Sequence, residues 1–445
     1  MFKRKIYAKM LEWKRRSKGS TALLIEGARR IGKSTIVEAF AKNEYESYIL
    51  IDFSRAGKDL KDLFEDLSST DYLFMQLQLL FNTKLIERKS LIIFDEVQFC
   101  PKARQAIKLL VEDGKYDYIE TGSLISIRKN VENILIPSEE EKLSMYPMDF
   151  EEFLWATGDT ASNDILRECF LNGTSLGEAA SRKMLLKFRL YMLVGGMPQA
   201  VAKYIESNNL EEVDMVKRNI ITLYLDDFYK LDMRGFTSDL YRNIPSELSR
   251  HTSSYKISSV LKNERPSTVQ DEIRELVESK TVLASYNSTD PGASLALTKD
   301  INKFKLYLSD TGLFVTLMFM DKPFTKNEIY KKLLSNKSEV NLGMLYENAV
   351  ATSLRALGYD LYFNTCYDEE LKKTYELDFL ISSGNKIYPI EVKSSGYKAH
   401  KSLDVFIDKY RSRIGKSFVI YTKDYLKEGD IVYLPVYYTQ FLDEI

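Results

Sequence analysis

Residues 27–34 read Gly-Ala-Arg-Arg-Ile-Gly-Lys-Ser, which matches the pattern GxxxxGK[ST]. An apolar run, TALLIEG (21–27), precedes this stretch, and a helical pattern, STIVEAFAKN, follows it. Two glycines let the backbone wrap closely around phosphates, so that the loop's N–H groups point inward. Lys33 would place its charge at the β- and γ-phosphates, and the Ser34 hydroxyl would bind Mg²⁺. The predicted nucleotide-binding residues are Gly27, Ala28, Arg29, Arg30, Ile31, Gly32, Lys33, Ser34 and Thr35.

An acidic pair ends the apolar run SLIIFDEV (90–97) and supplies the second half of the predicted site. Asp95 would hold Mg²⁺, and Glu96 beside it would polarise the attacking water. A solvated strand end is the alternative for such a pair. The two segments together predict ATP and Mg²⁺ as cofactors, with Lys33 and Glu96 as catalytic residues and Ser34 and Asp95 as metal ligands.

The segment YDYIETGS (116–123) ends in two hydroxyl side chains, Thr121 and Ser123. A hydroxyl at the end of this strand commonly senses the γ-phosphate, and we favour Ser123 for that catalytic role. The alternative is that both are turn residues.

Short apolar runs alternate with helical patterns over residues 20–150, which predicts a parallel sheet with crossover helices. Residues 151–253 have mainly helical patterns, and residues 254–320 follow the order helix, turn, helix and two strands that is typical of a winged helix-turn-helix. A basic amphipathic helix is expected at residues 1–19 and an α/β domain at 340–445, with a linker between 321 and 340. The expected strands of the first sheet are 21–27, 47–54, 90–97, 116–123 and a fifth near 143–150.

Four residues of the last segment form a second candidate site. Glu347 lies on an expected helix, Asp378 in an expected strand, and Glu391 and Lys393 alternate on the next strand, where an i, i+2 pair faces the same side. Carboxylates and a lysine on one sheet edge would bind a divalent metal and activate water, which predicts Glu347, Asp378 and Glu391 as ligands of a second Mg²⁺ or Mn²⁺ and Lys393 as a catalytic residue. A domain that only binds nucleic acid or only packs is the alternative.

The charge of the chain limits its partners. It has 63 Lys+Arg and 64 Asp+Glu, so a DNA or RNA site must be a local patch. Residues 392–416 offer one, with seven Lys or Arg and two Asp. The expected recognition helix, STVQDEIRELVESK, is net acidic, which favours packing over base reading. Three dispersed cysteines favour a cytoplasmic location, and the apolar runs are too short for a membrane partner.

The motifs GARRIGKST, LIIFDEVQ, ETGS and GGMPQA, in this order, resemble a bacterial and archaeal group of AAA-type (ASCE) P-loop ATPases. The resemblance implies a P-loop parallel-sheet core, a helical lid, a winged helix and a C-terminal restriction-endonuclease-like α/β domain. It also implies an extra strand between the strands of the two nucleotide motifs, and SYILIDFS (47–54) is assigned to that slot. The acidic residues resemble those of PD-(D/E)xK nucleases, with Glu347 as the helical acid and Glu391-Val392-Lys393 as ExK.

These observations predict Mg²⁺-dependent ATP binding and hydrolysis, coupled to a nuclease-like domain that contacts nucleic acid. The alternative is a slow nucleotide switch or scaffold in a defence or regulatory complex, with a catalytically silent nuclease fold. Association with further copies of the chain or with another protein stays open, because several arginines are available to act in trans and nothing ranks them.

Overall fold

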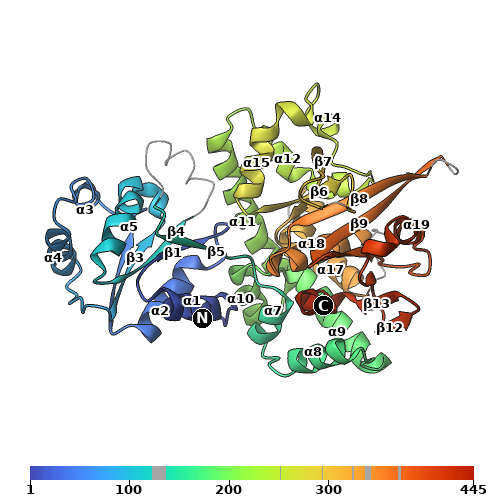
Figure 1. The fold of residues 1–445 in the computed structure, drawn as a ribbon, viewed down its shortest axis with the longest axis horizontal. Coiled ribbons are helices and arrows are strands. Elements are labelled where there is room, and N and C mark those ends of the chain that lie inside the picture. The colour runs from blue at the N-terminus through green and yellow to red at the C-terminus, as the bar shows by residue number, and fades with distance from the viewer. Residues whose placement is uncertain (123–136, 251, 293, 323–324, 336–341, 369–371) are drawn as a thin grey trace. The chain divides into compact units, whose positions relative to one another are not determined.

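The computed structural model describes residues 1–122, 137–250, 252–292, 294–322, 325–335, 342–368 and 372–445 (Figure 1). It divides into two compact units, Met1–Tyr146 with Glu278–Lys280, and Pro147–Val277 with Thr281–Ile445. The first boundary therefore lies close to the predicted end of the P-loop segment at residue 150. Segments 151–253, 254–320 and 340–445, which the sequence predicts as separate domains, share the second unit.

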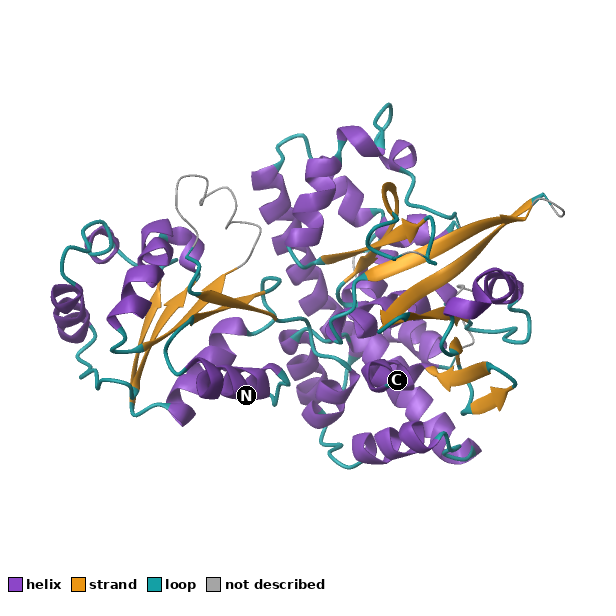
Figure 2. Cartoon of the chain, in the orientation of Figure 1, coloured by secondary structure: helices purple, strands orange, loops and turns teal. Residues whose placement is uncertain are grey.

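The first unit contains a five-stranded parallel sheet with the strand order β2-β3-β4-β1-β5. The residues of β1, β3 and β4 are buried throughout, which explains the apolar runs in β1 and β3. Figure 2 shows helices on both sides of this sheet. The strands are β1 (Ala22–Glu26), β2 (Ser47–Asp52), β3 (Ser90–Asp95), β4 (Asp117–Gly122) and β5 (Glu140–Ser144).

The sheet order corrects one assignment made from the sequence. The strand that lies between β1 and β3 is β4, whereas SYILIDFS forms β2, which pairs with β3 at the edge. Only every second residue in the second half of β2 is buried, as suits an edge strand. The order of strands along the chain does not fix their order in the sheet, so the pattern alone could not separate these two positions.

The fifth strand also differs from its prediction. It covers Glu140–Ser144 rather than a run near residues 143–150. Its sequence, EEKLS, conceals the strand because Glu140 is buried in an ion pair with Arg104, whose Nη2 lies 2.8 Å from Glu140 Oε1. Buried strands are usually recognised in a sequence by their apolar residues, and here an ion pair takes the place of apolar contacts.

The helices of the first unit include the predicted basic amphipathic helix, α1. Its buried residues are Ile6, Met10, Trp13 and Ser17, at helical spacing, so its apolar face packs on the unit. The helices are α1 (Ile6–Ser17), α2 (Lys33–Glu44), α3 (Lys58–Asp62), α4 (Thr70–Leu80) and α5 (Pro101–Asp113), with a short 3₁₀ helix, η1 (Val97–Phe99).

The second unit begins with helices and continues into a large mixed sheet. Helix α17 falls inside the expected linker at 321–340, and Tyr330 on it is fully buried, so this part of the segment is packed. The helices are α7 (Phe150–Ala156), α8 (Ser162–Asn172), α9 (Glu178–Val194), α10 (Pro198–Ser207), α11 (Leu210–Leu231), α12 (Phe236–Arg242), α13 (Ile244–Ser249), α14 (Ile257–Val260), α15 (Gln270–Glu278), α16 (Thr311–Met318), α17 (Asn327–Leu334), α18 (Gly343–Ala356) and α19 (Lys401–Tyr410), with 3₁₀ helices η2 (Pro266–Thr268), η3 (Arg411–Arg413) and η4 (Val436–Glu444).

The sheet of the second unit has eight strands in the order β12-β13-β11-β10-β9-β8-β6-β7. Strand β6 pairs in parallel with β8, so the two strands of segment 254–320 extend the sheet of segment 340–445. Within the described ranges, none of the helices combines the length and hydrophobicity that a membrane span requires. The strands are β6 (Val282–Ser288), β7 (Lys299–Leu308), β8 (Leu361–Asp368), β9 (Lys373–Ser383), β10 (Lys386–Val392), β11 (Ser417–Tyr421), β12 (Leu426–Glu428) and β13 (Ile431–Pro435).

The glycines of the GGMPQA motif pack against the start of α16. Gly195 has a φ of +83°, and a Cβ there would lie 2.4 Å from Asp310 Oδ1. The Gly196 N–H donates to Asp310 Oδ2 at 2.6 Å. This motif therefore has a structural role inside the second unit, because only glycine permits so close an approach.

Candidate functional site

The loop at residues 27–34 connects β1 to α2 and is shaped by its glycines. Gly32 adopts a φ of +93° and caps α2, which begins at Lys33. A Cβ at Gly27 would lie 2.3 Å from the carbonyl oxygen of Met145. Both positions therefore need glycine, one for its backbone conformation and one for space. The free N–H groups at the start of α2 favour an anion in front of the loop.

Lys33 lies within the loop and is only 5% exposed. Its Nζ donates to the carbonyl oxygens of Gly27 at 3.0 Å and Ala28 at 2.9 Å. An ammonium has three N–H donors, so one remains for a phosphate oxygen. Burial lowers the pKa of Lys33, although the carboxylates of Glu96 and Asp95 act in the opposite direction.

Ser34 and Asp95 are in direct contact. Ser34 Oγ donates to Asp95 Oδ1 at 2.7 Å, which brings the start of α2 to the end of β3. Thr121, at the end of β4, also donates to Asp95 Oδ1. A hydroxyl and a carboxylate at this separation form a donor set that suits Mg²⁺, which prefers oxygen ligands.

Glu96 follows Asp95 in the left-handed conformation, with a φ of +53°. Its N–H donates to Thr121 Oγ1 at 3.2 Å, and its Oε2 accepts a hydrogen bond from the side chain of Gln98. These bonds fix the turn after β3 and hold the carboxylate in place. Thr121 thus links both acidic residues to β4, a role that the sequence did not reveal.

Arg4 contacts the backbone of the phosphate loop, and its role was not predicted from the sequence. Its guanidinium donates to the carbonyl oxygen of Ile31 at 3.1 Å and to that of Tyr146 at 2.6 Å. The side chain is 7% exposed. A buried arginine with loop carbonyls as partners stabilises the loop conformation, so Arg4 is a positioning residue.

The remaining predicted residues of this site differ in exposure. Ala28 and Ile31 are buried, Arg29 is partly buried, and Arg30 and Thr35 are exposed. Arg30 takes a φ of +70° at the outer turn of the loop. Ser123 lies outside the described residues.

The second candidate site lies on the eight-stranded sheet. Glu391 near the end of β10 is 4% exposed, and its Oε1 lies 2.8 Å from Lys393 Nζ. Asp378 on β9 accepts the Val392 N–H through Oδ2 at 2.7 Å. Burial and the nearby carboxylates of Glu391 and Glu347 raise the pKa of Asp378.

Glu347 on α18 faces a different set of partners. Its Oε1 accepts hydrogen bonds from Lys305 Nζ at 2.9 Å and from the Tyr307 hydroxyl at 2.5 Å, both on β7. Lys305 also pairs with Glu376 Oε1 at 2.5 Å. Across the part of the chain that the structure describes, no three His, Cys, Asp or Glu side chains are grouped so that they could hold a metal ion. The predicted ligands Glu347, Asp378 and Glu391 are thus not assembled as a metal centre.

Lys305, Tyr307 and Glu376 were not predicted as site residues. The alternation in KFKLYLSD places Lys303, Lys305 and Tyr307 on one face of β7, and Glu376 shares a face of β9 with Asp378. The alternation of side chains within each strand could therefore be read from the sequence. The pairing of β6 with β8, which brings β7 into this sheet, could not be read from the sequence.

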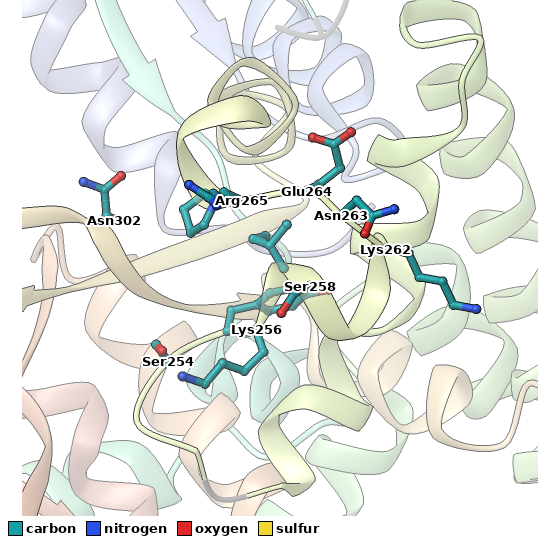
Figure 3. Close-up of a pocket in the computed structure, with 11 residues that line it drawn as sticks. Ser254, Lys256, Ser258, Lys262, Asn263, Glu264, Arg265 and Asn302 are labelled. Atoms are coloured by element: carbon teal, nitrogen blue, oxygen red, sulfur yellow. The ribbon is translucent and has the colours of Figure 1, made fainter.

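A basic hollow occupies the turn before α15 (Figure 3). It has a volume of about 810 Å³, and its charged lining residues are Lys256, Lys262, Arg265 and Glu264. The three cationic side chains are exposed and are spread around the hollow rather than pointing to one spot.

Comparisons with known proteins agree with the geometry of the first unit. Residues 19–154 match the family profile of the AAA domain, residues 185–323 that of a domain of unknown function (DUF8612), and residues 342–438 that of a second domain of unknown function (DUF4143). The first unit is therefore a P-loop domain of the AAA type. No curated protein matches the chain significantly.

Three solved structures show a distant similarity to the chain. One is the RuvB Holliday junction branch migration motor of Thermotoga maritima, with 12% identity, a TM-score of 0.28, and coverage of 63% of this chain and 89% of that chain. PCH-2 of C. elegans has 13% identity, a TM-score of 0.26, and coverage of 48% and 68%. Protein VC1899 of Vibrio cholerae has 10% identity, a TM-score of 0.19, and coverage of 95% and 96%. At these TM-scores the similarities carry no argument about this chain.

Proposed function

We propose that the protein binds ATP with Mg²⁺ at residues 27–35 and hydrolyses it. The observation that carries this proposal is the contact between Ser34 and Asp95 beside a buried Lys33. A glycine loop, an ammonium, a hydroxyl and a carboxylate are the groups that a nucleoside triphosphate with Mg²⁺ requires.

Each residue then has a defined task. The loop N–H groups and Lys33 bind the phosphates, and Ser34 and Asp95 would hold Mg²⁺, which supplies neutralisation of phosphate charge. Glu96 orients the attacking water and accepts its proton. Thr121 keeps the Asp95 carboxylate in place, and Arg29 and Arg30 add positive charge near the phosphates.

The test is a calorimetric titration with ATP and Mg²⁺, together with steady-state phosphate release. The wild type should bind and turn over ATP, whereas Lys33→Ala should bind much more weakly and release no phosphate above background. Absence of heat with any nucleoside triphosphate in the wild type would overturn the proposal.

We further propose that the second unit contacts DNA or RNA and that the contact is coupled to hydrolysis. Two basic surfaces support this proposal, the hollow in Figure 3 and the exposed cations on and around α19, which include Lys398, Lys401, Lys409, Arg411, Arg413 and Lys416. Cations that face solvent can bind a phosphate backbone without reading its sequence.

Turnover measured with and without DNA or RNA tests this coupling. A nucleic acid that binds should change the rate, and the double change Lys398→Glu, Lys401→Glu should weaken the effect while basal turnover is kept. If neither DNA nor RNA binds or alters the rate at low salt, the second unit has another partner.

A slow nucleotide switch or scaffold is the second candidate. A specific observation favours it, because Glu347, Glu376 and Glu391 pair with lysines of the protein, and the described residues contain no group of acidic, His or Cys side chains that could hold a metal ion. Steady-state kinetics separate the two candidates, since a motor turns over continuously whereas a switch hydrolyses about one ATP per activation. Size measurement with and without ATP tests self-association or binding to a protein partner.

A further inference from the structure

We propose that Lys305 is the resident cation of the acidic cluster in the second unit, so that Glu347, Asp378 and Glu391 bind no divalent metal in the wild-type chain. The resemblance to PD-(D/E)xK nucleases assigns a metal ion to these carboxylates. The structure supplies an ammonium group of the protein instead, and this inference rests on no property of the nucleotide site.

The position of Lys305 is the first argument. Its side chain is 6% exposed, and its Nζ lies 2.9 Å from Glu347 Oε1 and 2.5 Å from Glu376 Oε1. A buried ammonium requires compensation by carboxylates, and carboxylates buried together require a cation. Lys305 meets both requirements, and its ion pairs connect β7 to α18 and to β9.

The occupied oxygen atoms are the second argument. Glu347 Oε1 accepts from Lys305 and Tyr307, Asp378 Oδ2 accepts the Val392 N–H, and Glu391 Oε1 pairs with Lys393. A divalent ion at Glu347 would also face the ammonium of Lys305 at close range, and two positive charges repel strongly where water is excluded. These residues do not fit a resident metal ion.

The unpaired oxygen of Glu391 shows what the cluster could bind if Lys305 were removed. Glu391 Oε2 is buried and has no hydrogen-bond partner in the described part of the chain. Removal of the ammonium would leave Glu347 and Glu376 without the cation that pairs with them, and carboxylate oxygens are the donors that attract Mn²⁺.

The change Lys305→Met tests the proposal because it keeps the length of the side chain and removes its charge. Without metal, the melting temperature of the second unit should fall by on the order of 10 °C. Mn²⁺ should then restore part of the loss and bind at one additional site, as counted by electron paramagnetic resonance of free Mn²⁺. Lys303→Met is the matched control, since Lys303 lies on the same face of β7 and donates to Thr365 Oγ1. It should not create a Mn²⁺ site.

Wild type and Asp378→Asn provide a second measurement, which remains informative if Lys305→Met does not fold. Their Mn²⁺ binding curves without nucleotide should coincide. A Mn²⁺ ion bound by the wild type and lost in Asp378→Asn overturns the proposal. A Lys305→Met variant that is as stable as the wild type without metal overturns it as well.

Discussion

Ser34 Oγ and Asp95 Oδ1 lie 2.7 Å apart although 61 positions separate them in the chain. The contact joins the first turn of α2 to the end of β3, and it therefore links the phosphate loop to the acidic pair. Because both side chains would be ligands of Mg²⁺, changing either of them should affect ATP binding only when Mg²⁺ is present.

Ser34→Ala should weaken ATP binding only when Mg²⁺ is present. The change removes a metal ligand but leaves Lys33 and the loop N–H groups, which bind the phosphates. We expect affinity for ATP in Mg²⁺ to fall by about tenfold, corresponding to the loss of roughly 1.4 kcal/mol. The measurement is a titration with ATP in Mg²⁺ and again in EDTA. Equal losses in both buffers would assign Ser34 to loop structure rather than to the metal.

Glu96→Gln should abolish turnover while ATP binding stays within about twofold of the wild type. Glutamine keeps the shape of the side chain and its contact with Gln98, but it cannot accept the proton of the attacking water. Loss of a general base commonly costs about 10²- to 10⁴-fold in rate. Phosphate release and nucleotide affinity are measured on the same preparation. A variant that retains more than a tenth of the wild-type rate contradicts the assigned role.

Arg4→Ala should lower nucleotide affinity about fivefold, because the Ile31 carbonyl loses the guanidinium that fixes the loop. Arg4→Lys should recover part of the affinity, since one ammonium can reach one of the two carbonyls. Arg15→Ala is the matched control, as Arg15 is an exposed residue of α1. Affinity is measured well below the melting temperature. If Arg4→Ala melts earlier yet binds ATP normally, Arg4 supports the fold alone.

The sequence was sufficient for features that depend on local pattern. The loop at 27–34, the apolar strands β1 and β3, and the helical spacing of Ile6, Met10 and Trp13 all follow from neighbours a few positions apart. These signals are strong because each element is buried in a way that repeats along the chain.

Features that depend on partners distant in the chain could not be predicted in this way. Glu140 conceals a strand because its cation, Arg104, comes from α5, and Lys305 enters the acidic cluster only because β6 pairs with β8. Arg4 reaches the loop from a residue before α1. In each case a charged residue is buried by a partner that no local pattern identifies.

Gly195→Ala should destabilise the second unit far more than Gly177→Ala. Both glycines flank α9 with positive φ and extended ψ, at +85° and 148° for Gly177 and at +83° and −175° for Gly195, so both substitutions carry a backbone strain. A Cβ at Gly177 meets nothing within 4 Å, whereas one at Gly195 would lie 2.4 Å from Asp310 Oδ1. We expect about 2 kcal/mol for Gly177→Ala and at least about 4 kcal/mol for Gly195→Ala. Denaturant unfolding measures both, and equal losses would show that the close packing at Gly195 relaxes freely.

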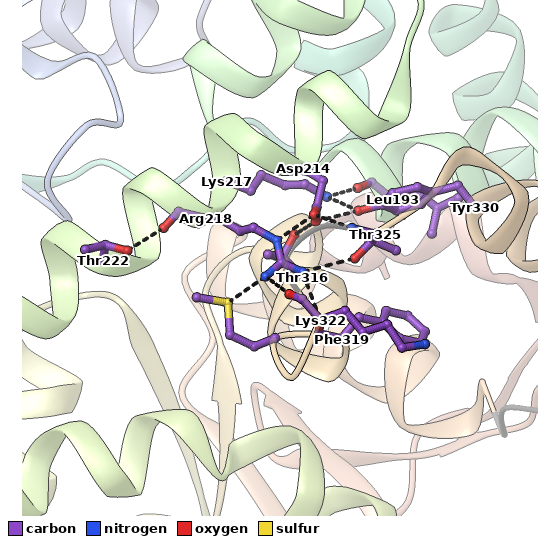
Figure 4. A network of polar contacts seen from close by, with 11 residues as sticks. Leu193, Asp214, Lys217, Arg218, Thr222, Thr316, Phe319, Lys322, Thr325 and Tyr330 are labelled. Carbon is purple, nitrogen blue, oxygen red and sulfur yellow. Dashed lines mark hydrogen bonds and ion pairs between the residues drawn. The ribbon is translucent and has the colours of Figure 1, made fainter.

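Lys217 gives the second unit a predictable dependence on pH. It is fully buried in α11, its Nζ donates to the carbonyl oxygen of Leu193 at 2.7 Å, and Asp214 beside it bonds with Arg218 (Figure 4). Burial lowers the pKa of Lys217 from 10.5 to about 8, although Asp214 acts against the shift. Between these two values the unfolded chain holds the proton more tightly than the folded chain, so stability should rise as pH increases from about 8.

The burial of this charge costs on the order of 3 kcal/mol below pH 8. Lys217→Met should therefore remove the rise in stability with pH. Near pH 7 the variant should be about as stable as the wild type or slightly more stable, because the gain from removing the buried charge is offset by the loss of the hydrogen bond to Leu193. Lys230→Met is the matched control, because Lys230 is an exposed residue of the same helix.

Unfolding can be followed through a single tryptophan. The chain has two, Trp13 in the first unit and Trp155 in α7 of the second, so a Trp13→Phe background reports on the second unit alone. Denaturation midpoints between pH 7.5 and 9.5 stay below the range in which free tyrosine ionises, near pH 10. A wild-type midpoint that stays flat or falls over this range, or an equal slope in Lys217→Met, would show that Lys217 is not the group that titrates.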